Sequence, residues 1–198
     1  MGHLSNLKIY LCGQVEVDIY CAQWRNRMTR ALHQVEPSLI IWDPLIKPQW
    51  VTPESRNDSI ALDKRVYVDP ASTIDTWEAN KEIRRVCKAL VGGCDIVVAR
   101  ISKQFTWGSI DELEIACDRG IPIFVCYPDG PFGLYGLTGL VSGPEMIREY
   151  IYSDEVELVA KLAGINGGTD DLPKRDPYRW LALSYPNAVN HVPTTIEA

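Results

Sequence analysis

The sequence predicts an α/β fold: a three-layer sandwich of flavodoxin-like or Rossmann-like type, with a mainly parallel five-stranded sheet. Two observations predict it. Short apolar runs alternate along the chain with segments of helical period, which is typical of parallel strands joined by crossover helices. A length of 198 residues with 46% hydrophobic residues also suits one domain with an ample core.

Short β-rich apolar runs are the expected strands. The first run stops at Gly13, and the second leads into Asp43-Pro44, residue types that interrupt regular structure. The expected strands are 7–12, 39–42, 95–99, 121–126 and 148–152.

The two segments that separate the first three expected strands have apolar residues at helical spacing, so each is expected to contain a helix. In the segment 17–35, Trp24, Met28 and Leu32 share one stripe. The arginines of this segment fall largely off that stripe: Arg25, Arg27 and Arg30. A second helix opens with the capping box Asp75-Thr76-Trp77-Glu78 and stops at Gly92-Gly93. Its apolar residues are Ile83, Val86, Cys87 and Leu90.

Two further helices complete the alternation. One starts at Gly108, and the helical period places Ile110, Leu113 and Cys117 against the sheet. The last is expected over 154–163.

No internal repeat or second domain is visible, so we expect one α/β domain over 1–165 and an extended tail over 166–198. Within the domain, the segment 43–72 is rich in proline, aspartate and asparagine and has no clear period. Irregular connections of this length are uncommon in compact domains and are usually functional. We therefore expect this segment to fold over the carboxyl edge of the sheet as a lid.

Composition excludes several classes of function. A net charge of −6 and a pI near 5.1 disfavour binding to a nucleic-acid polymer. No apolar stretch is long enough to span a membrane, and no signal peptide is visible, so a cytoplasmic protein is expected.

The cysteines and histidines do not indicate a metal site. The 6 cysteines contain no C-x-x-C pair and are expected to be reduced thiols, and the 3 histidines are isolated from one another. The dinucleotide fingerprint G-x-G-x-x-G is missing after the first strand. We therefore expect no metal and no cofactor.

Glu112 belongs to neither the apolar face nor the solvated face of its helix. Asp111, Glu114 and Asp118 repeat on what is most simply the solvated face. The neighbours of Glu112 one turn away, Ser109 and Ala116, are small and leave space around its carboxylate. Helix N-termini favour anions, so an acid here, at the carboxyl end of a parallel strand, is well placed for chemistry. A structural alternative is that Ser109-x-x-Glu112 is a capping box.

Three short motifs within residues 7–127 carry a resemblance. They are Ile9-Tyr10-Leu11-Cys12-Gly13, Cys94-Asp95-Ile96-Val97-Val98-Ala99, and Gly108-Ser109-x-x-Glu112-x-x-x-Ala116 followed by Gly120-Ile121-Pro122. Together they resemble the nucleoside 2-deoxyribosyltransferase family, which includes related nucleotide N-glycosidases. In that family the acid of the Gly-Thr/Ser-x-x-Glu helix attacks the anomeric carbon of the sugar, and a tyrosine of the first strand positions it. The resemblance thus implies that Glu112 is the nucleophile and Tyr10 its orienting partner.

Two positions depart from the family pattern. Members carry an aspartate six positions before the nucleophile, where this chain has Thr106, and another that falls here on Cys87. Both aspartates help to handle the nucleobase. Asp43 or Asp129 could replace them, although each also fits a turn residue, in Asp-Pro and Pro-Asp-Gly respectively.

Further candidate binding residues follow the carboxyl ends of the expected strands. They include Cys12-Gly13-Gln14, Asp43, the stretch 100–108 and the stretch 127–135. Arg100, with Ser109 and the helix N-terminus at Gly108, could hold a 5′-phosphate or a 5′-hydroxyl; alternatively it is a surface arginine paired with an acid. The aromatic residues could stack on a base or simply cover the core. They are Phe105, Trp107, Phe132 and Tyr135.

The resemblance implies cleavage of the N-glycosidic bond of a nucleoside or nucleotide through a glycosyl–Glu112 intermediate. Water as acceptor makes the protein a hydrolase, and a second base makes it a transferase. The alternatives are a non-catalytic nucleotide-binding or sensor module and a phosphoribohydrolase of the lysine-decarboxylase-like family. Family members complete each site with a neighbour's loop, here 129–135, so we expect a homodimer or a larger even-numbered oligomer with Phe132 or Tyr135 near the neighbour's Glu112.

Overall fold

A computed structural model describes residues 2–14, 21–45, 76–102, 107–128 and 151–170, and the statements below concern these residues. The described strands are β1 (Lys8–Gly13), β2 (Ile40–Trp42), β3 (Ile96–Arg100), β4 (Ile123–Cys126) and β5 (Ile151–Tyr152). The described helices are α1 (Cys21–Val35), α2 (Thr76–Gly92), α3 (Trp107–Asp118) and α6 (Glu155–Gly167).

The strands form one parallel sheet in the order β2-β1-β3-β4-β5. β1 lies between β2 and β3, with Tyr10 paired to Trp42 of β2 and to Val97 of β3. Gly13 and Arg100 are partners at the ends of β1 and β3. The predicted parallel five-stranded sheet is therefore confirmed, and the boundaries of β1 to β4 lie within two residues of those expected. The first three residues of the expected strand 148–152 lie outside the described residues.

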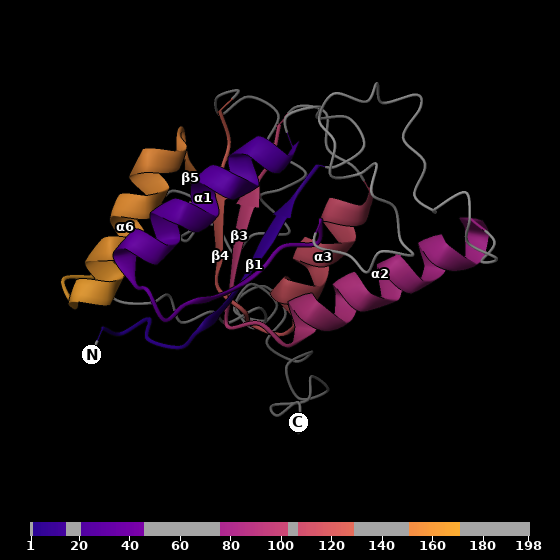
Figure 1. The fold of residues 1–198 in the computed structure, drawn as a ribbon, viewed down its shortest axis with the longest axis horizontal. Coiled ribbons are helices and arrows are strands. Elements are labelled where there is room, and N and C mark those ends of the chain that lie inside the picture. Colours follow the sequence, from indigo (N-terminus) through magenta and orange to yellow (C-terminus); the bar gives the residue numbers. More distant parts are fainter. Residues whose placement is uncertain (1, 15–20, 46–75, 103–106, 129–150, 171–198) are drawn as a thin grey trace, which may run out of the picture.

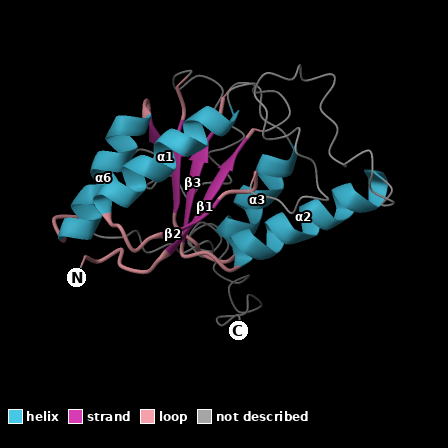
Figure 2. Cartoon of the chain, in the orientation of Figure 1, coloured by secondary structure: helices cyan, strands magenta, loops and turns pink. Residues whose placement is uncertain are grey.

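Helices cover both faces of the sheet (Figure 1). α1 and α6 pack on one face, and α2 and α3 pack on the other, as the colouring by secondary structure also shows (Figure 2). Alternation along β1 divides the core accordingly: Ile9 and Leu11 face α1 and α6, whereas Tyr10 and Cys12 face α2 and α3. The predicted three-layer α/β architecture is confirmed.

Helix α6 extends past the end of the expected helix 154–163. Asp154 is its N-cap, where the carboxylate accepts from the amides of Val156 and Glu157, and Gly168 is its left-handed C-cap. The expected lid (43–72), the loop 129–135 and the tail beyond residue 170 lie largely or wholly outside the described residues.

Arg25 corrects the reading of α1. It was expected off the apolar stripe, yet its side chain is fully buried together with Trp24, Met28 and Leu32. Arg25 stands three residues before Met28 and seven before Leu32, so the helical period itself places it on the stripe.

The buried faces of α2 and α3 also differ from the expectation. In α3 the buried residues are Ser109, Leu113 and Ala116, while Ile110 and Cys117 are only partly buried. Small side chains let this helix approach the sheet closely, so the buried stripe is centred on them. In α2, Val86 is 41% exposed, because this helix contacts the rest of the protein along a narrow face.

Neither a metal cluster nor a membrane helix is found in the part of the chain that the structure describes. Cys12, Cys87, Cys94, Cys117 and Cys126 form no disulfide there. No group of three metal-ligating side chains occurs among these residues. None of the described helices is both long and apolar enough to cross a bilayer.

Candidate functional site

The strand order places a topological switch point at the carboxyl ends of β1 and β3. From β1 the chain crosses to β2 on one side of it, and the later strands β3, β4 and β5 lie on the other side. In open parallel sheets, ligands bind at such a switch point, beyond the carboxyl ends of the strands. α3, which follows β3 in the chain, brings Glu112 to the face of the sheet where Tyr10 lies.

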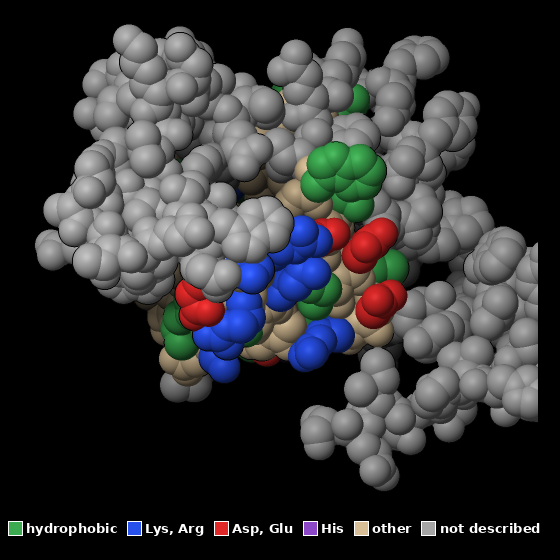
Figure 3. All heavy atoms as spheres, turned by 90° about the vertical axis from the view of Figure 1, so that its right-hand side faces the viewer, with side chains coloured by type: hydrophobic (Ala, Val, Ile, Leu, Met, Phe, Trp, Pro, Cys, Tyr) green, Lys and Arg blue, Asp and Glu red, His purple; other side chains and the backbone are tan. Residues whose placement is uncertain are grey.

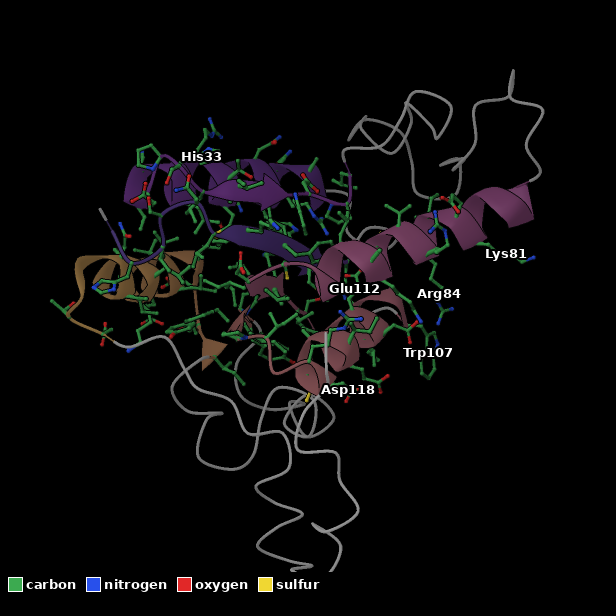
Figure 4. All side chains as sticks on the ribbon, turned by 90° about the horizontal axis from the view of Figure 1, so that it is seen from below. His33, Lys81, Arg84, Trp107, Glu112 and Asp118 are labelled. Atoms are coloured by element: carbon green, nitrogen blue, oxygen red, sulfur yellow. The ribbon has the colours of Figure 1, made fainter. Side chains whose placement is uncertain are left out.

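A phenol and a carboxylate meet at this place. The Tyr10 hydroxyl donates a hydrogen bond to Oε1 of Glu112 over 2.8 Å. Tyr10 comes from β1, and Glu112 lies on the flank of the buried stripe of α3, one turn from both Ser109 and Ala116. Figure 4 shows Glu112 lying inward, between the helices and the sheet, while Arg84 and Trp107 project outward. The expected contact between Tyr10 and Glu112 is therefore present.

Burial keeps this tyrosine protonated. The pKa of Tyr10 is raised well above its ordinary value, first because the side chain is desolvated and second because the negative charge of Glu112 lies nearby. Burial and the same carboxylate also raise the pKa of the Cys12 thiol. At neutral pH both groups are therefore neutral, and Tyr10 is a stable donor to the Glu112 carboxylate.

A second contact holds the first turn of α3 on β1. The Cys12 thiol donates to the backbone carbonyl of Ser109 over 3.7 Å. Cys12 follows Tyr10 by two residues on the strand, and Ser109 precedes Glu112 by three residues on the helix. The two contacts thus fix the position and the rotation of the turn that carries Glu112.

The capping-box alternative for Ser109 does not hold. α3 begins at Trp107, so Ser109 lies inside the first turn and not at the N-cap, and it is buried at 3% exposure. Gly108, next to it, is exposed, and a Cβ there would meet no atom within 4 Å. Neither residue is therefore the N-cap of this helix.

Gly13, the last residue of β1, packs closely against its neighbours. A Cβ on Gly13 would lie 2.8 Å from the carbonyl oxygen of Arg100 and 2.8 Å from the ring of Trp24. The strand end can approach these neighbours only because residue 13 is glycine. This close packing explains the glycine without a ligand.

Asp43 is engaged by the protein itself. One of its oxygens accepts from the amide of Leu45 over 2.9 Å and lies 3.4 Å from Nε of Arg25. Arg25 also donates to the carbonyl of Gly13 over 2.8 Å and to that of Gln14 over 3.4 Å, and its guanidinium stacks on Trp24. The turn interpretation of Asp43 therefore fits, with the addition of a buried ion pair.

Arg100 and Trp107 lie away from the pair formed by Tyr10 and Glu112. Ile96 and Val98 of β3 face α1 and α6, and alternation places Arg100 on that same side, where it pairs with Glu155 of α6 over 3.6 Å. Trp107 is 82% exposed. Thr106, Asp129 and Phe132 lie outside the described residues.

On the outer side of α3, Asp111 faces α2. It forms ion pairs with Arg84 and Lys88, the latter over 3.7 Å. Figure 3 shows Lys and Arg side chains gathered beside Asp and Glu side chains on this face of the molecule. The acid next to Glu112 in sequence is thus part of a partly exposed ionic surface.

Comparison with known proteins supports the fold. No family model matches the chain, and no curated protein matches it in sequence. A 2-deoxyribosyltransferase from the psychrotolerant bacterium Bacillus psychrosaccharolyticus has a similar structure, with a TM-score of 0.54 and 15% identity over 85% of this chain and 97% of that one. At this identity the likeness shows a shared Rossmann-like α/β fold.

Two other solved structures are more distant. A CMP N-glycosidase from Clostridium botulinum gives a TM-score of 0.41 at 13% identity, over 78% of this chain and 96% of that one. A conserved protein from Enterococcus faecalis V583 gives 0.46 at 16% identity, over 79% and 87%.

Proposed function

We propose that the protein cleaves the N-glycosidic bond of a nucleoside or nucleotide, with Glu112 as nucleophile and Tyr10 as its orienting partner. The observation that carries the proposal is the 2.8 Å hydrogen bond from a buried, protonated tyrosine to a carboxylate at the carboxyl edge of a parallel sheet. A carboxylate nucleophile is a common solution for displacement at an anomeric carbon. The motif resemblance and the fold shared with a 2-deoxyribosyltransferase agree with it.

The first step exchanges one bond for another. A lone pair of the Glu112 carboxylate forms a bond to the anomeric carbon while the bond from that carbon to the base nitrogen breaks. The base leaves with the bonding electrons and takes up a proton. Tyr10 holds one carboxylate oxygen in place throughout, which limits the rotation that the attacking group must lose.

The second step regenerates the carboxylate. An oxygen of water, or a nitrogen of another base, attacks the same carbon from the face that the first base left. The ester bond to Glu112 breaks, and the attacking group gives up a proton. Water makes the protein an N-glycosidase, and a second base makes it a 2-deoxyribosyltransferase; two inversions retain the configuration at the sugar in both.

Protonation of the leaving base falls to a residue outside the described part of the chain. Asp43 is held by Arg25 and by the amide of Leu45, so it is poorly placed to release a proton to a base. Asp129 remains the candidate acid, and Thr106 remains a candidate substrate-binding residue. We also propose that the loop 129–135 of a second copy completes the site in a homodimer or a larger even-numbered oligomer.

Incubation with a panel of nucleosides and their 5′-monophosphates tests the proposal. Free base, separated by chromatography, should accumulate with at least one of these substrates, and adding a second base should show whether transfer competes with hydrolysis. Glu112→Ala should release no base while keeping its melting temperature. If the wild-type protein binds a nucleotide but releases base from none, the non-catalytic sensor module is the better account.

A further inference from the structure

A buried amide at the carboxyl edge of the sheet has a polar atom without a partner. The Gln14 side chain is 4% exposed, and its Oε1 accepts a hydrogen bond from the hydroxyl of Ser102 over 2.7 Å. Its Nε2 finds no hydrogen-bond partner in the part of the chain that the structure describes. Leaving a buried donor unsatisfied costs about 1–3 kcal/mol, so such atoms in native proteins call for an explanation.

The position of this amide indicates a ligand. Gln14 follows the end of β1, and Ser102 follows the end of β3 by two residues. Because Gly13 and Arg100 are register partners, the two side chains bridge the strands between which the sheet order reverses. That is where ligands bind in this topology.

The amide is also held in advance of binding. Arg25 donates to the backbone carbonyls of Gly13 and Gln14, and Ser102 fixes the side-chain oxygen. The side chain therefore has little freedom left to lose when a ligand arrives, which favours affinity. A loosely held surface glutamine would not have this property.

The chemistry of the donor selects a neutral acceptor. An amide NH₂ carries no charge, and the arginines that flank this edge, Arg25 and Arg100, have carboxylate partners in Asp43 and Glu155. Phosphate groups are typically bound by charged, multidentate donors, whereas a single amide suits a hydroxyl oxygen.

We propose that Gln14 is a substrate-binding residue whose Nε2 donates to a hydroxyl oxygen of the nucleoside sugar, with Ser102 as its positioning residue. This inference rests on the proposed function, because that function supplies the nucleoside. It adds a substrate class: nucleosides are preferred over their 5′-monophosphates at this end of the site.

Binding to a catalytically silent protein tests the inference without activity. Calorimetry with thymidine, 2′-deoxycytidine and 2′-deoxyadenosine on Glu112→Ala should give binding that weakens about two- to tenfold when Gln14→Met is added, since a hydrogen bond contributes about 0.5–1.5 kcal/mol. Methionine matches glutamine in length. It removes the orphan donor but also the acceptor of the partly exposed Ser102 hydroxyl, so the two effects offset each other and the melting temperature should change little. A fall in melting temperature with unchanged binding would show a structural glutamine and overturn the inference.

Ligands that lack one hydroxyl identify the acceptor. The 5′-deoxy and 3′-deoxy analogues of the tightest nucleoside should each bind the Gln14 protein, and one of them should lose its sensitivity to Gln14→Met. This non-additivity is the mark of a direct contact between the amide and that hydroxyl. Equal sensitivity for every analogue, or tighter and Gln14-independent binding of the 5′-monophosphates, would contradict a sugar-hydroxyl contact.

The two proposals fail differently. Base release by the wild-type protein together with full activity of Gln14→Met would leave the proposed function intact and overturn the inference. Nucleoside binding that depends on Gln14, with no base release, would support the binding site and overturn the enzyme. If no nucleoside binds and none is cleaved, both are wrong.

Discussion

Two adjacent acidic residues on α3, Asp111 and Glu112, have contrasting surroundings. Asp111 faces α2 and pairs with Arg84 and Lys88 on a partly exposed surface. Glu112 faces β1 and accepts a hydrogen bond from the neutral Tyr10, whose hydroxyl is buried. The two carboxylates differ by one position in sequence, and therefore by about 100° around the helix.

The difference shows what makes a carboxylate useful for chemistry. Arg84 and Lys88 pair with Asp111 at the surface, and such an exposed ion pair contributes little to the free energy of unfolding. A phenol orients Glu112 but does not cancel its charge, so the carboxylate keeps its negative charge for attack on an electrophilic carbon. We expect mutations on the two sides of the helix to separate catalysis from surface stability.

The largest expected effect comes from exchanging each acid for its amide. Glu112→Gln should lower the rate of base release by on the order of 10³-fold or more, because it removes the nucleophile. Asp111→Asn, the matched change next to it, should leave kcat within about threefold of wild type. Initial rates and melting temperatures of both variants check this prediction. A comparable loss of activity in both would remove the distinction between the two sides.

Tyr10→Phe, on the side of α3 that faces β1, should lower the activity less than Glu112→Gln does. It keeps the buried ring and removes only the hydroxyl that holds Glu112. A hydrogen bond to a charged group is worth about 1.5–3 kcal/mol, which corresponds to a loss of about 10- to 100-fold in kcat/KM. The measurement is steady-state kinetics with wild type and variant on one substrate. Unchanged kinetics would mean that Tyr10 only fills the core.

The protein should become less stable at alkaline pH, and Tyr10 should contribute to this loss whereas Asp111 should not. The pKa of Tyr10 is raised in the folded protein, above the value of 10.0 that an exposed tyrosine has. The unfolded chain therefore loses this proton first, and the free energy of unfolding falls as the pH rises above about 10. Burial raises the pKa values of Cys94 and Cys126 to about 11 each, which acts in the same direction from about pH 9 upward.

Denaturant unfolding between pH 8 and pH 11 measures this decline, starting about one unit below the pH at which the cysteines begin to contribute. Tyr10→Phe should make the decline shallower, since it removes one of the groups that cause it. Asp111→Asn should not, because it leaves Tyr10 and its burial unchanged. An identical slope in wild type and Tyr10→Phe would show that Tyr10 does not contribute.

The smallest effect is expected for the exposed ion pair between Arg84 of α2 and Asp111 of α3. Arg84→Met should lower the free energy of unfolding by about 0.5 kcal/mol or less, since an exposed ion pair contributes little. The difference should shrink further at high salt, where screening weakens the pair. Urea titrations at low and high salt check it. A loss of base release in this variant would show that the ionic surface reaches the site.

The sequence was sufficient for the parts of the fold that depend on local pattern. Alternating strands and helices and the parallel sheet could be predicted from periodicity. The meeting of Tyr10 with Glu112 was implied by the family resemblance. The buried face of α3 could not, because hydrophobicity favours Ile110 and Cys117, while close packing against the sheet selects the small Ser109 and Ala116.

Contacts between residues that are distant in sequence were also missed. Arg25 is buried because Asp43 and the carbonyls at the end of β1 receive its charge, and no local pattern contains that pairing. Gln14 and Ser102 meet only because β1 and β3 are neighbours in the sheet. The position of Arg25 on the helical period, next to Trp24, was the one signal that could have indicated its burial.

The central claim is that the sugar becomes covalently attached to Glu112. Acid quenching during turnover of a cleaved deoxynucleoside, followed by proteolysis and mass spectrometry, tests it directly. We predict an adduct of the mass of the sugar residue on Glu112, absent from Glu112→Gln and more weakly populated in Tyr10→Phe. Base release without any adduct on Glu112, or an adduct on Asp111, would contradict the account.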